Sequence, residues 1–155
     1  MNKTRRKEVF WISIIILAVI GVIILWMKYW TYAQYWEEIG GRNYEQIVEK
    51  YGGPNEIKEK GNYDEIYYDE MVFHRGGPRC NRVDFVIIED ETIRFGILNI
   101  GVGSSKSTIE AVYFFKPKLQ PVGENSFAVT DWTNDITFEF DEDDKVKKIY
   151  VYYHG

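Results

Sequence analysis

Cysteine and histidine, the residues on which many metal and redox sites depend, are scarce in this chain. Its 155 residues include one cysteine, Cys80, and two histidines, His74 and His154. A single cysteine excludes an intrachain disulfide, so Cys80 is either a buried thiol, which we expect, or part of an intermolecular bridge. Two histidines exclude a metal site built on several imidazoles. We therefore expect neither a bound metal ion nor a cofactor.

Positive charge is scarce beyond the first 28 residues. This first segment has one acidic residue, Glu8, and five basic residues: Lys3, Arg5, Arg6, Lys7 and Lys28. The rest of the chain has 14 basic and 23 acidic residues, which gives it a net charge of −9. Such a charge repels nucleic-acid backbones, which are bound by clustered Lys and Arg side chains. The sequence therefore predicts no nucleic-acid partner.

Charge is absent altogether from the 18-residue run Phe10–Met27, which is rich in Ile, Val and Leu. As a helix this run would rise ~27 Å, close to the ~30 Å hydrocarbon core of a bilayer. A cleaved signal peptide is the alternative, although its apolar region usually has only about 7–15 residues. Because the basic residues precede the run, the N-terminus is expected in the cytoplasm and the remainder outside.

These features predict four segments. Residues 1–9 are a cytoplasmic basic flank, residues 10–32 an uncleaved transmembrane helix, and residues 33–42 a juxtamembrane linker. Residues 43–155 then form one extracytoplasmic domain, since about 115 residues suit a single folding unit. The predicted location is therefore the cell membrane, which the chain crosses once.

Helical and strand-like patterns alternate within residues 43–155. Residues 43–51 have apolar side chains at helical spacing and end at Gly52-Gly53-Pro54, which stops a helix. A second helix is predicted where Ser107–Glu110 fits a capping box, with Ile109, Val112 and Phe115 on one side. Runs of β-branched and aromatic residues predict strands at 65–74, 82–88, 92–100, 126–132, 135–140 and 145–153.

The same order of elements occurs twice. Residues 43–96 and residues 97–153 each consist of a short helix, a proline stop and several antiparallel strands, which indicates a tandem repeat. The hairpin of strands 135–140 and 145–153 is the clearest local pattern, because apolar and polar residues alternate in it. The predicted fold class is α+β, with short helices packed on an antiparallel β-sheet in two related halves, preceded by one N-terminal transmembrane helix.

Three motifs suggest catalytic or ligand-binding chemistry, but each lacks a part that the chemistry needs. Residues 101–107 resemble a phosphate-binding loop, yet Ile100 and Ser105 stand where that motif has glycine. Asp141–Asp144 lacks the glycine and the distal glutamate of an EF-hand loop, and a solvated turn explains it better. His74 and Cys80 could form a base and a nucleophile, but no third group orients them. We therefore expect no enzymatic activity.

The aromatic residues supply the candidate site instead. In the last predicted strand Tyr150 and Tyr152 share one face with Lys148, because successive side chains point to opposite sides. An exposed face of this kind would resemble protein interfaces, which are enriched in aromatic residues. The alternative is that a second layer of the protein covers it. The predicted partner-binding residues are Tyr67, Trp132, Lys148, Tyr150 and Tyr152.

Two stretches of the chain resemble small envelope proteins. Residues Ile100–Val112, followed by a proline, and residues Asp135–Ile149 resemble SmpA/OmlA-type lipoproteins and tandem β-lactamase-inhibitor-protein-like domains. The resemblance covers residues 97–153 well and residues 43–96 loosely. It implies short helices against an antiparallel sheet, with envelope assembly as the activity of the first family and enzyme inhibition as that of the second. The spanning helix in place of a lipid anchor or cleaved signal fits a cell envelope with one membrane.

These observations predict a membrane-anchored extracytoplasmic module that binds a protein partner, as an inhibitor, an immunity factor or an envelope-assembly subunit. Two alternatives stay open. A membrane-bound hydrolase or small-ligand sensor would need a deep pocket in which carboxylates join His74 or Cys80. A purely structural role beside another membrane protein is the third possibility.

Overall fold

The computed structural model describes residues 3–33, 35–77, 80–96, 98–113, 119–121, 125–130 and 134–154. Its helices are α1 (Lys3–Ala33), α2 (Tyr35–Ile39), α3 (Tyr44–Tyr51) and α4 (Lys106–Tyr113). Its strands are β1 (Glu56–Glu59), β2 (Asp64–Tyr68), β3 (Met71–Arg75), β4 (Val83–Ile88), β5 (Arg94–Phe95), β6 (Ile100–Gly101), β7 (Leu119–Pro121), β8 (Ser126–Thr130), β9 (Asn134–Phe140) and β10 (Val146–Tyr153). The α+β class predicted from the sequence is confirmed.

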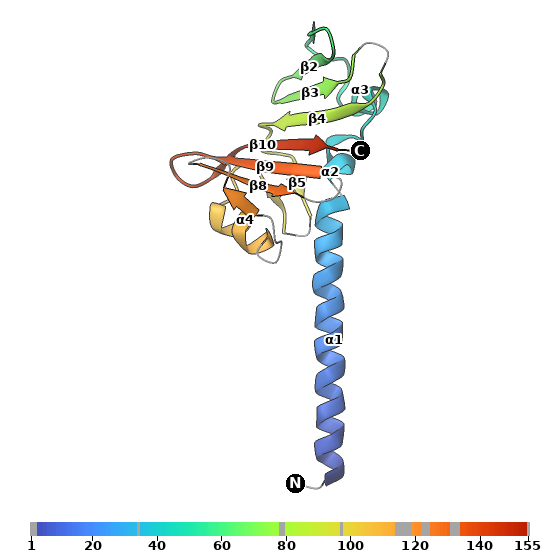
Figure 1. Ribbon diagram of the computed structural model, residues 1–155, viewed down its shortest axis with the longest axis vertical. Coiled ribbons are helices and arrows are strands. Elements are labelled where there is room, and N and C mark those ends of the chain that lie inside the picture. The colour runs from blue at the N-terminus through green and yellow to red at the C-terminus, as the bar shows by residue number, and fades with distance from the viewer. Residues whose placement is uncertain are drawn as a thin grey trace.

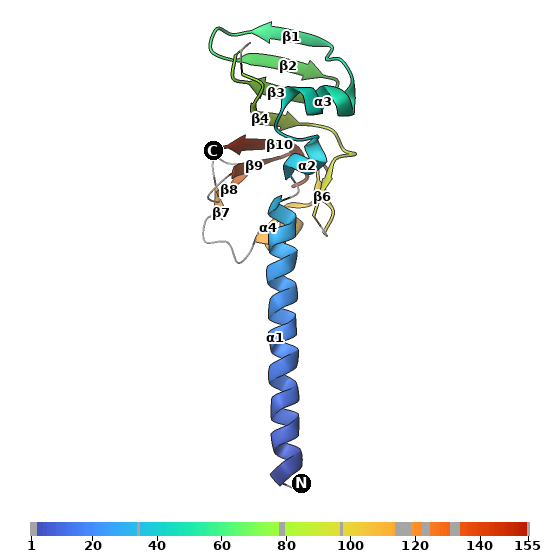
Figure 2. The ribbon, with the colours of Figure 1, turned by 90° about the vertical axis from the view of Figure 1, so that its right-hand side faces the viewer.

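Helix α1 extends away from the rest of the molecule, with the N-terminus at its far end (Figures 1 and 2). From Val9 to Leu25 its large apolar side chains are exposed on all sides of the helix. Within the described residues, no helix is at once long enough and apolar enough to cross a membrane.

The strands form one eight-stranded antiparallel sheet in the order β1-β2-β3-β4-β10-β9-β8-β7. Strands β1 to β4 are one meander and β7 to β10 are another, and the two meet where β4 pairs with β10. The sheet runs from β1, at the end farthest from α1, toward β7 (Figure 2). Strands β5 and β6 form a separate two-stranded ladder.

Each meander follows a short helix. Helix α3 precedes β1 to β4, and helix α4 precedes β7 to β10. The relation of the two halves, residues 43–96 and 97–153, stays a prediction. The small ladder crosses the boundary between them, because β5 belongs to the first half and β6 to the second.

Two strand predictions are corrected by the structure. Residues 65–74 are not one strand but the hairpin of β2 and β3, which turns at Asp69 and Glu70. This turn contains no glycine or proline, so the sequence around it looks continuous. Residues 92–100 form no single strand either, since β5 and β6 occupy the ends of that stretch and pair with each other. The predicted hairpin of residues 135–140 and 145–153 is confirmed as β9 and β10.

The predicted helix at residues 43–51 is confirmed as α3, whereas the predicted capping box at Ser107–Glu110 is wrong. Helix α4 begins at Lys106, and the Ser105 Oγ atom accepts the Thr108 backbone N–H at 3.2 Å. Lys106 therefore stands inside the helix, and the capping oxygen comes from the serine two residues before the one that we expected.

The hydrophobic core lies between one face of the sheet and the helices. One cross-strand row on this face is buried in six neighbouring strands of the sheet: β2, β3, β4, β10, β9 and β8. Its members are Ile66, Phe73, Val86, Val151, Ile136 and Val129. Helices α3 and α4 add Ile47 and Ile109 to the same core cluster. We call this side the covered face.

The segment that we expected as a linker, residues 33–42, contributes to this core. Helix α2 lies within it, and its Tyr35, Trp36 and Ile39 are buried. The Tyr35 ring stacks on Phe95 with 4.2 Å between the ring centroids. The Trp36 indole N–H donates to Asn134 Oδ1 at 2.9 Å. Residues 35–39 are therefore part of the folded domain, which begins earlier than residue 43.

Candidate functional site

The opposite face of the sheet carries partly exposed aromatic residues. Antiparallel pairing aligns one row across six strands, and its members are Tyr67, Val72, Ile87, Tyr150, Thr137 and Ala128. The adjacent row contains Glu65, His74, Phe85 and Tyr152. Every side chain of the first row is partly exposed. We call this side the open face, because no layer of the described residues buries it.

Aromatic rings on the open face form a continuous strip from β3 to β10. The His74 ring stacks on Tyr63 at 5.0 Å between centroids and lies 4.6 Å from the Phe85 ring. Phe85 in turn lies 6.3 Å from Tyr150 and 6.2 Å from Tyr152. We call these five residues the aromatic strip. Contacts between rings at these distances are favourable and restrict the side-chain conformations.

Carboxylates accept hydrogen bonds from two tyrosine hydroxyls on the open face. The Tyr150 hydroxyl donates to Glu139 Oε2 at 2.7 Å, and the Tyr67 hydroxyl donates to Glu65 Oε2 at 2.8 Å. Burial, and then the bond to Glu139, raises the pKa of Tyr150 to about 12. The bond to Glu65 is the main cause that raises the pKa of Tyr67. Both hydroxyls therefore stay protonated donors at neutral pH.

An open hollow lies along the aromatic strip and is lined by four of its five residues together with Asp84. Its lining residues are Tyr63, His74, Asp84, Phe85 and Tyr152. The register between β3 and β4 shifts at His74 and Arg75, so Asp84 is left outside the ladder pairs. Such an irregularity turns a side chain that regular pairing would place elsewhere. Burial lowers the pKa of His74, while Glu65 and Asp84 oppose this shift.

The structure brings together four of the five residues that the sequence predicted for the site. Tyr67, Tyr150 and Tyr152 lie on the open face, and Lys148 lies there too, where its Nζ contacts Glu89 Oε1 at 2.6 Å. Trp132 lies outside the described residues.

Tyr63, His74 and Phe85 also contribute to this face, although they were not among the predicted partner-binding residues. Phe85 belongs to a central strand with apolar residues on both sides, so period-two alternation gives no signal for its orientation. Tyr63 lies in the turn before β2, and only its stacking on His74 brings it to the face.

Cys80 and His74, the two residues considered for hydrolytic chemistry, contact different neighbours. The Cys80 thiol is only partly buried, which differs from the buried thiol that we expected, and its Sγ atom lies 3.9 Å from the Arg82 carbonyl oxygen. His74 instead packs between Tyr63 and Phe85. A hydrolase or small-ligand sensor would need an enclosed pocket, whereas the hollow with His74 and Asp84 is open.

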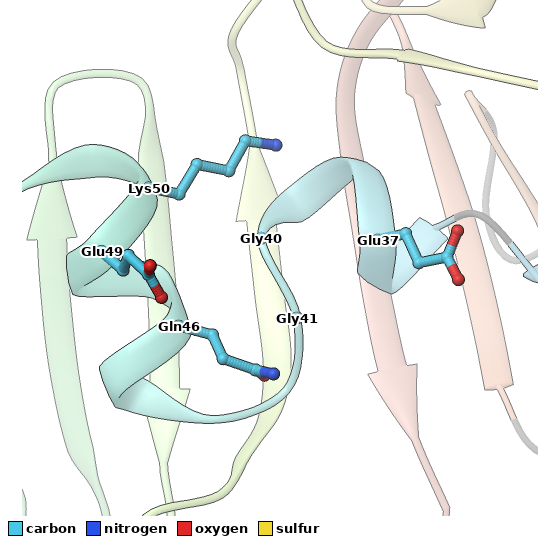
Figure 3. A pocket seen from close by; sticks show the side chains of 6 residues that line it. All are labelled: Glu37, Gly40, Gly41, Gln46, Glu49 and Lys50. Carbon is cyan, nitrogen blue, oxygen red and sulfur yellow. The ribbon is translucent and has the colours of Figure 1, made fainter.

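A second hollow, shown in Figure 3, lies where α2 meets α3, and its residues serve the fold. Gln46 points toward Gly41, whereas Glu37 points away from α3. Gly41 has a φ of +95°, and a side chain there would clash with the Gln46 amide. The Lys50 ammonium group donates to the Glu38 carbonyl oxygen. These contacts fix the corner between the two helices.

Comparisons with known proteins show similarity at the level of the fold. The sequence matches no protein-family model, and no curated protein matches it. An extracellular protein with an SCP domain from Bacillus anthracis is similar in structure, with a TM-score of 0.54, 14% identity, and coverage of 75% of this chain and 44% of that one. For a cysteine-rich secretory protein from Staphylococcus aureus the TM-score is 0.54 at 10% identity, with 72% and 44% covered.

A DUF4309 family protein from Bacillus subtilis is similar over more of its length. The TM-score is 0.51 at 8% identity, and the match covers 82% of this chain and 95% of that one. The chain spans less than half the length of the Bacillus anthracis and Staphylococcus aureus proteins. At these identities the likeness shows the fold alone. These proteins carry other family names than SmpA/OmlA or β-lactamase-inhibitor protein, so that resemblance stays a prediction.

Proposed function

We propose that this chain is a membrane-anchored extracytoplasmic module that binds a protein partner through the open face of its sheet. The observation that carries the proposal is the aromatic strip, whose rings are held in place by one another and remain partly exposed. Rigid aromatic side chains supply much of the binding energy at protein interfaces, because they bury a large area at little cost in conformational entropy.

The membrane anchor is supported by helix α1. A helix with large apolar side chains on all sides is unfavourable in water, and α1 exposes them from Val9 to Leu25. The sequence continues the uncharged run to Met27, and four basic residues precede it. Two of the structurally similar proteins are described as extracellular or secretory, which agrees with a domain outside the cell.

We also propose that the two halves arose by duplication of one helix–meander unit. The matching order of their elements supports this origin.

A photocrosslinking experiment tests the binding face in native membranes. The photoreactive residue p-benzoylphenylalanine is placed at Tyr152, which is 43% exposed on the open face, or at Leu98, which is 52% exposed near the β5–β6 ladder. We expect ultraviolet light to yield a discrete protein adduct from position 152 and none from position 98. The same adducts from both positions, or none from position 152, would contradict the proposed face.

The proposed anchor and orientation need a separate test. Protease is added to cells whose membrane is intact, and the fragments are identified by antibodies against each end of the chain. We expect loss of the C-terminal domain and survival of the first residues together with the span. A protected C-terminal domain, or a mature protein without its first thirty or so residues, would exclude an uncleaved anchor that displays the domain outside.

A further inference from the structure

We infer that the hollow formed by Tyr63, His74, Asp84, Phe85 and Tyr152 binds a cationic side chain of the partner, an arginine guanidinium group. This inference rests on the proposed function and names the chemistry that the open face recognises. It follows from the rings that line the hollow, from the Asp84 carboxylate, which has no hydrogen-bond partner among the described residues, and from the charge of the surrounding domain.

The rings supply flat faces for a cation. Tyr63 and Tyr152 are 37% and 43% exposed at two sides of the hollow, and Phe85 lies between them in the strip. The negative face of an aromatic ring attracts a cation, and a planar guanidinium group can also stack on it. A partner side chain in the hollow would contact more than one ring.

Asp84 supplies a carboxylate that faces His74 but accepts no hydrogen bond from the described residues. Among the described residues, its side chain has no hydrogen bond and no ion pair. Other carboxylates of the open face are engaged: Glu65 with Tyr67 and Lys60, Glu139 with Tyr150, Glu89 with Lys148, and Asp135 with His154. The hollow is lined by no lysine or arginine of the described chain. A partly buried carboxylate without a partner favours a ligand that can donate two parallel hydrogen bonds.

The charge of the domain favours the same class of ligand. Residues beyond position 28 have 14 basic and 23 acidic side chains. The resulting field attracts basic partners over long distances and repels acidic ones. The rings alone would accept any apolar group, so the unpaired carboxylate and the acidic surroundings decide in favour of a cation.

The test compares two peptides that differ only in charge. The full chain, isotopically labelled in zwitterionic detergent micelles, is titrated with acetyl-Gly-Arg-Gly-amide and with its neutral citrulline counterpart, and the ring signals of His74, Phe85 and Tyr152 are followed by NMR. We expect the arginine peptide alone to shift these signals in a saturable way. Asp84→Asn should weaken its binding about tenfold, the loss typical of one charge-assisted hydrogen bond.

Glu142→Gln is the matched control, because it removes one negative charge in the exposed β9–β10 turn, away from the hollow. It should change the affinity by less than about twofold. Equal shifts with the citrulline peptide, or equal losses in the two variants, would overturn the inference. An unchanged NMR spectrum away from the hollow shows that Asp84→Asn is folded.

The peptide titration and the crosslinking experiment separate the inference from the proposed function. If position 152 crosslinks to a protein but the arginine peptide does not bind, the inference fails while the proposed function stands. If the arginine peptide binds but position 152 yields no protein adduct, the hollow takes a guanidinium group while the proposed function fails.

Discussion

The two faces of the eight-stranded sheet carry different side chains on neighbouring rows. On the covered face, the row through Phe73 and Val151 is buried in β2, β3, β4, β10, β9 and β8 and contains aliphatic residues and phenylalanine. On the open face, the adjacent row through Tyr67 and Tyr150 is partly exposed and contains tyrosines whose hydroxyls bond to carboxylates. Both rows belong to the same strands, so secondary structure does not account for the difference.

The difference predicts that the two faces contribute unequally to stability. The covered face contributes most of the folding free energy, because burial of apolar area is the main favourable term. The open face keeps large rings partly in water, where they add less stability than the same rings would in the core. Stability should therefore depend mainly on the covered face, and recognition on the open one.

The largest effect on stability is expected from Phe73→Ala. The Phe73 side chain is fully buried on the covered face, so its loss leaves a cavity and should lower the free energy of unfolding by about 3–5 kcal/mol. Denaturant unfolding of the full chain in micelles measures this. Tyr152→Ala on the open face is the comparison, and it should cost less than about 1 kcal/mol. Equal losses in the two variants would show that the open face is part of the core.

The next-largest effect on stability is expected from a buried ion pair on the covered face. Asp64 Oδ2 accepts from Arg75 at 2.6 Å, and the Asp64 side chain is almost fully buried. Asp64→Asn leaves the Arg75 charge without its partner and should cost about 3 kcal/mol in unfolding free energy. Lys148→Gln breaks an ion pair on the open face and should cost less than about 1 kcal/mol, since that pair is partly exposed. The reverse order would contradict the assignment of the two faces.

A smaller effect is expected from single hydroxyl groups. Tyr150→Phe removes the bond to Glu139 and should cost about 1 kcal/mol in unfolding free energy. Tyr152→Phe should be nearly neutral. An ultraviolet titration adds a second measurement, because Tyr150 should ionise only near its raised pKa of about 12. Equal stability of the two variants would show that the hydrogen bond from Tyr150 to Glu139 does not stabilise the fold.

The smallest effect concerns pH. Burial between Tyr63 and Phe85 holds the pKa of His74 below its usual 6.5, against the opposing charges of Glu65 and Asp84. The unfolded chain therefore takes up the proton first as the pH falls, so this residue lowers stability progressively below about pH 6.5 and has no such effect above it.

His74→Phe keeps a ring in place and removes the titration. Comparing the unfolding free energy near pH 7.5 and near pH 5.5, we expect a smaller acid loss in the variant than in the wild type. His154→Phe is the control, because it removes the other histidine of the open face, which contacts Tyr152 and Asp135. An identical acid loss in wild type and His74→Phe would mean that His74 does not titrate differently in the folded protein.

Local patterns in the sequence predicted the elements with strong periodicity. The alternation of Ile136, Phe138 and Phe140 with polar residues is confirmed in β9, where these three side chains are buried. The helix stop at Gly52-Gly53-Pro54 matches the end of α3 at Tyr51. The β2–β3 hairpin was missed, because a turn of Asp69 and Glu70 carries no residue that demands a turn.

Helix α2 was misread for a different reason. Aromatic residues after a long apolar run, such as Tyr35 and Trp36, can pack in a core or lie at a membrane interface, and the local sequence is the same in both cases. Only the contacts with Phe95 and Asn134, which lie far along the chain, place them in the core.

The sequence by itself determined the uncharged N-terminal run, the acidic balance of the remainder, and the alternation that gives Tyr150 and Tyr152 a common face. These are properties of neighbouring residues, which share one element and one period. The tertiary structure alone decided that Tyr67 joins Tyr150 across the sheet, that His74 and Phe85 complete the strip, and that Asp84 enters the hollow without a partner. Strand order and register create these contacts between distant segments, and no local pattern contains that information.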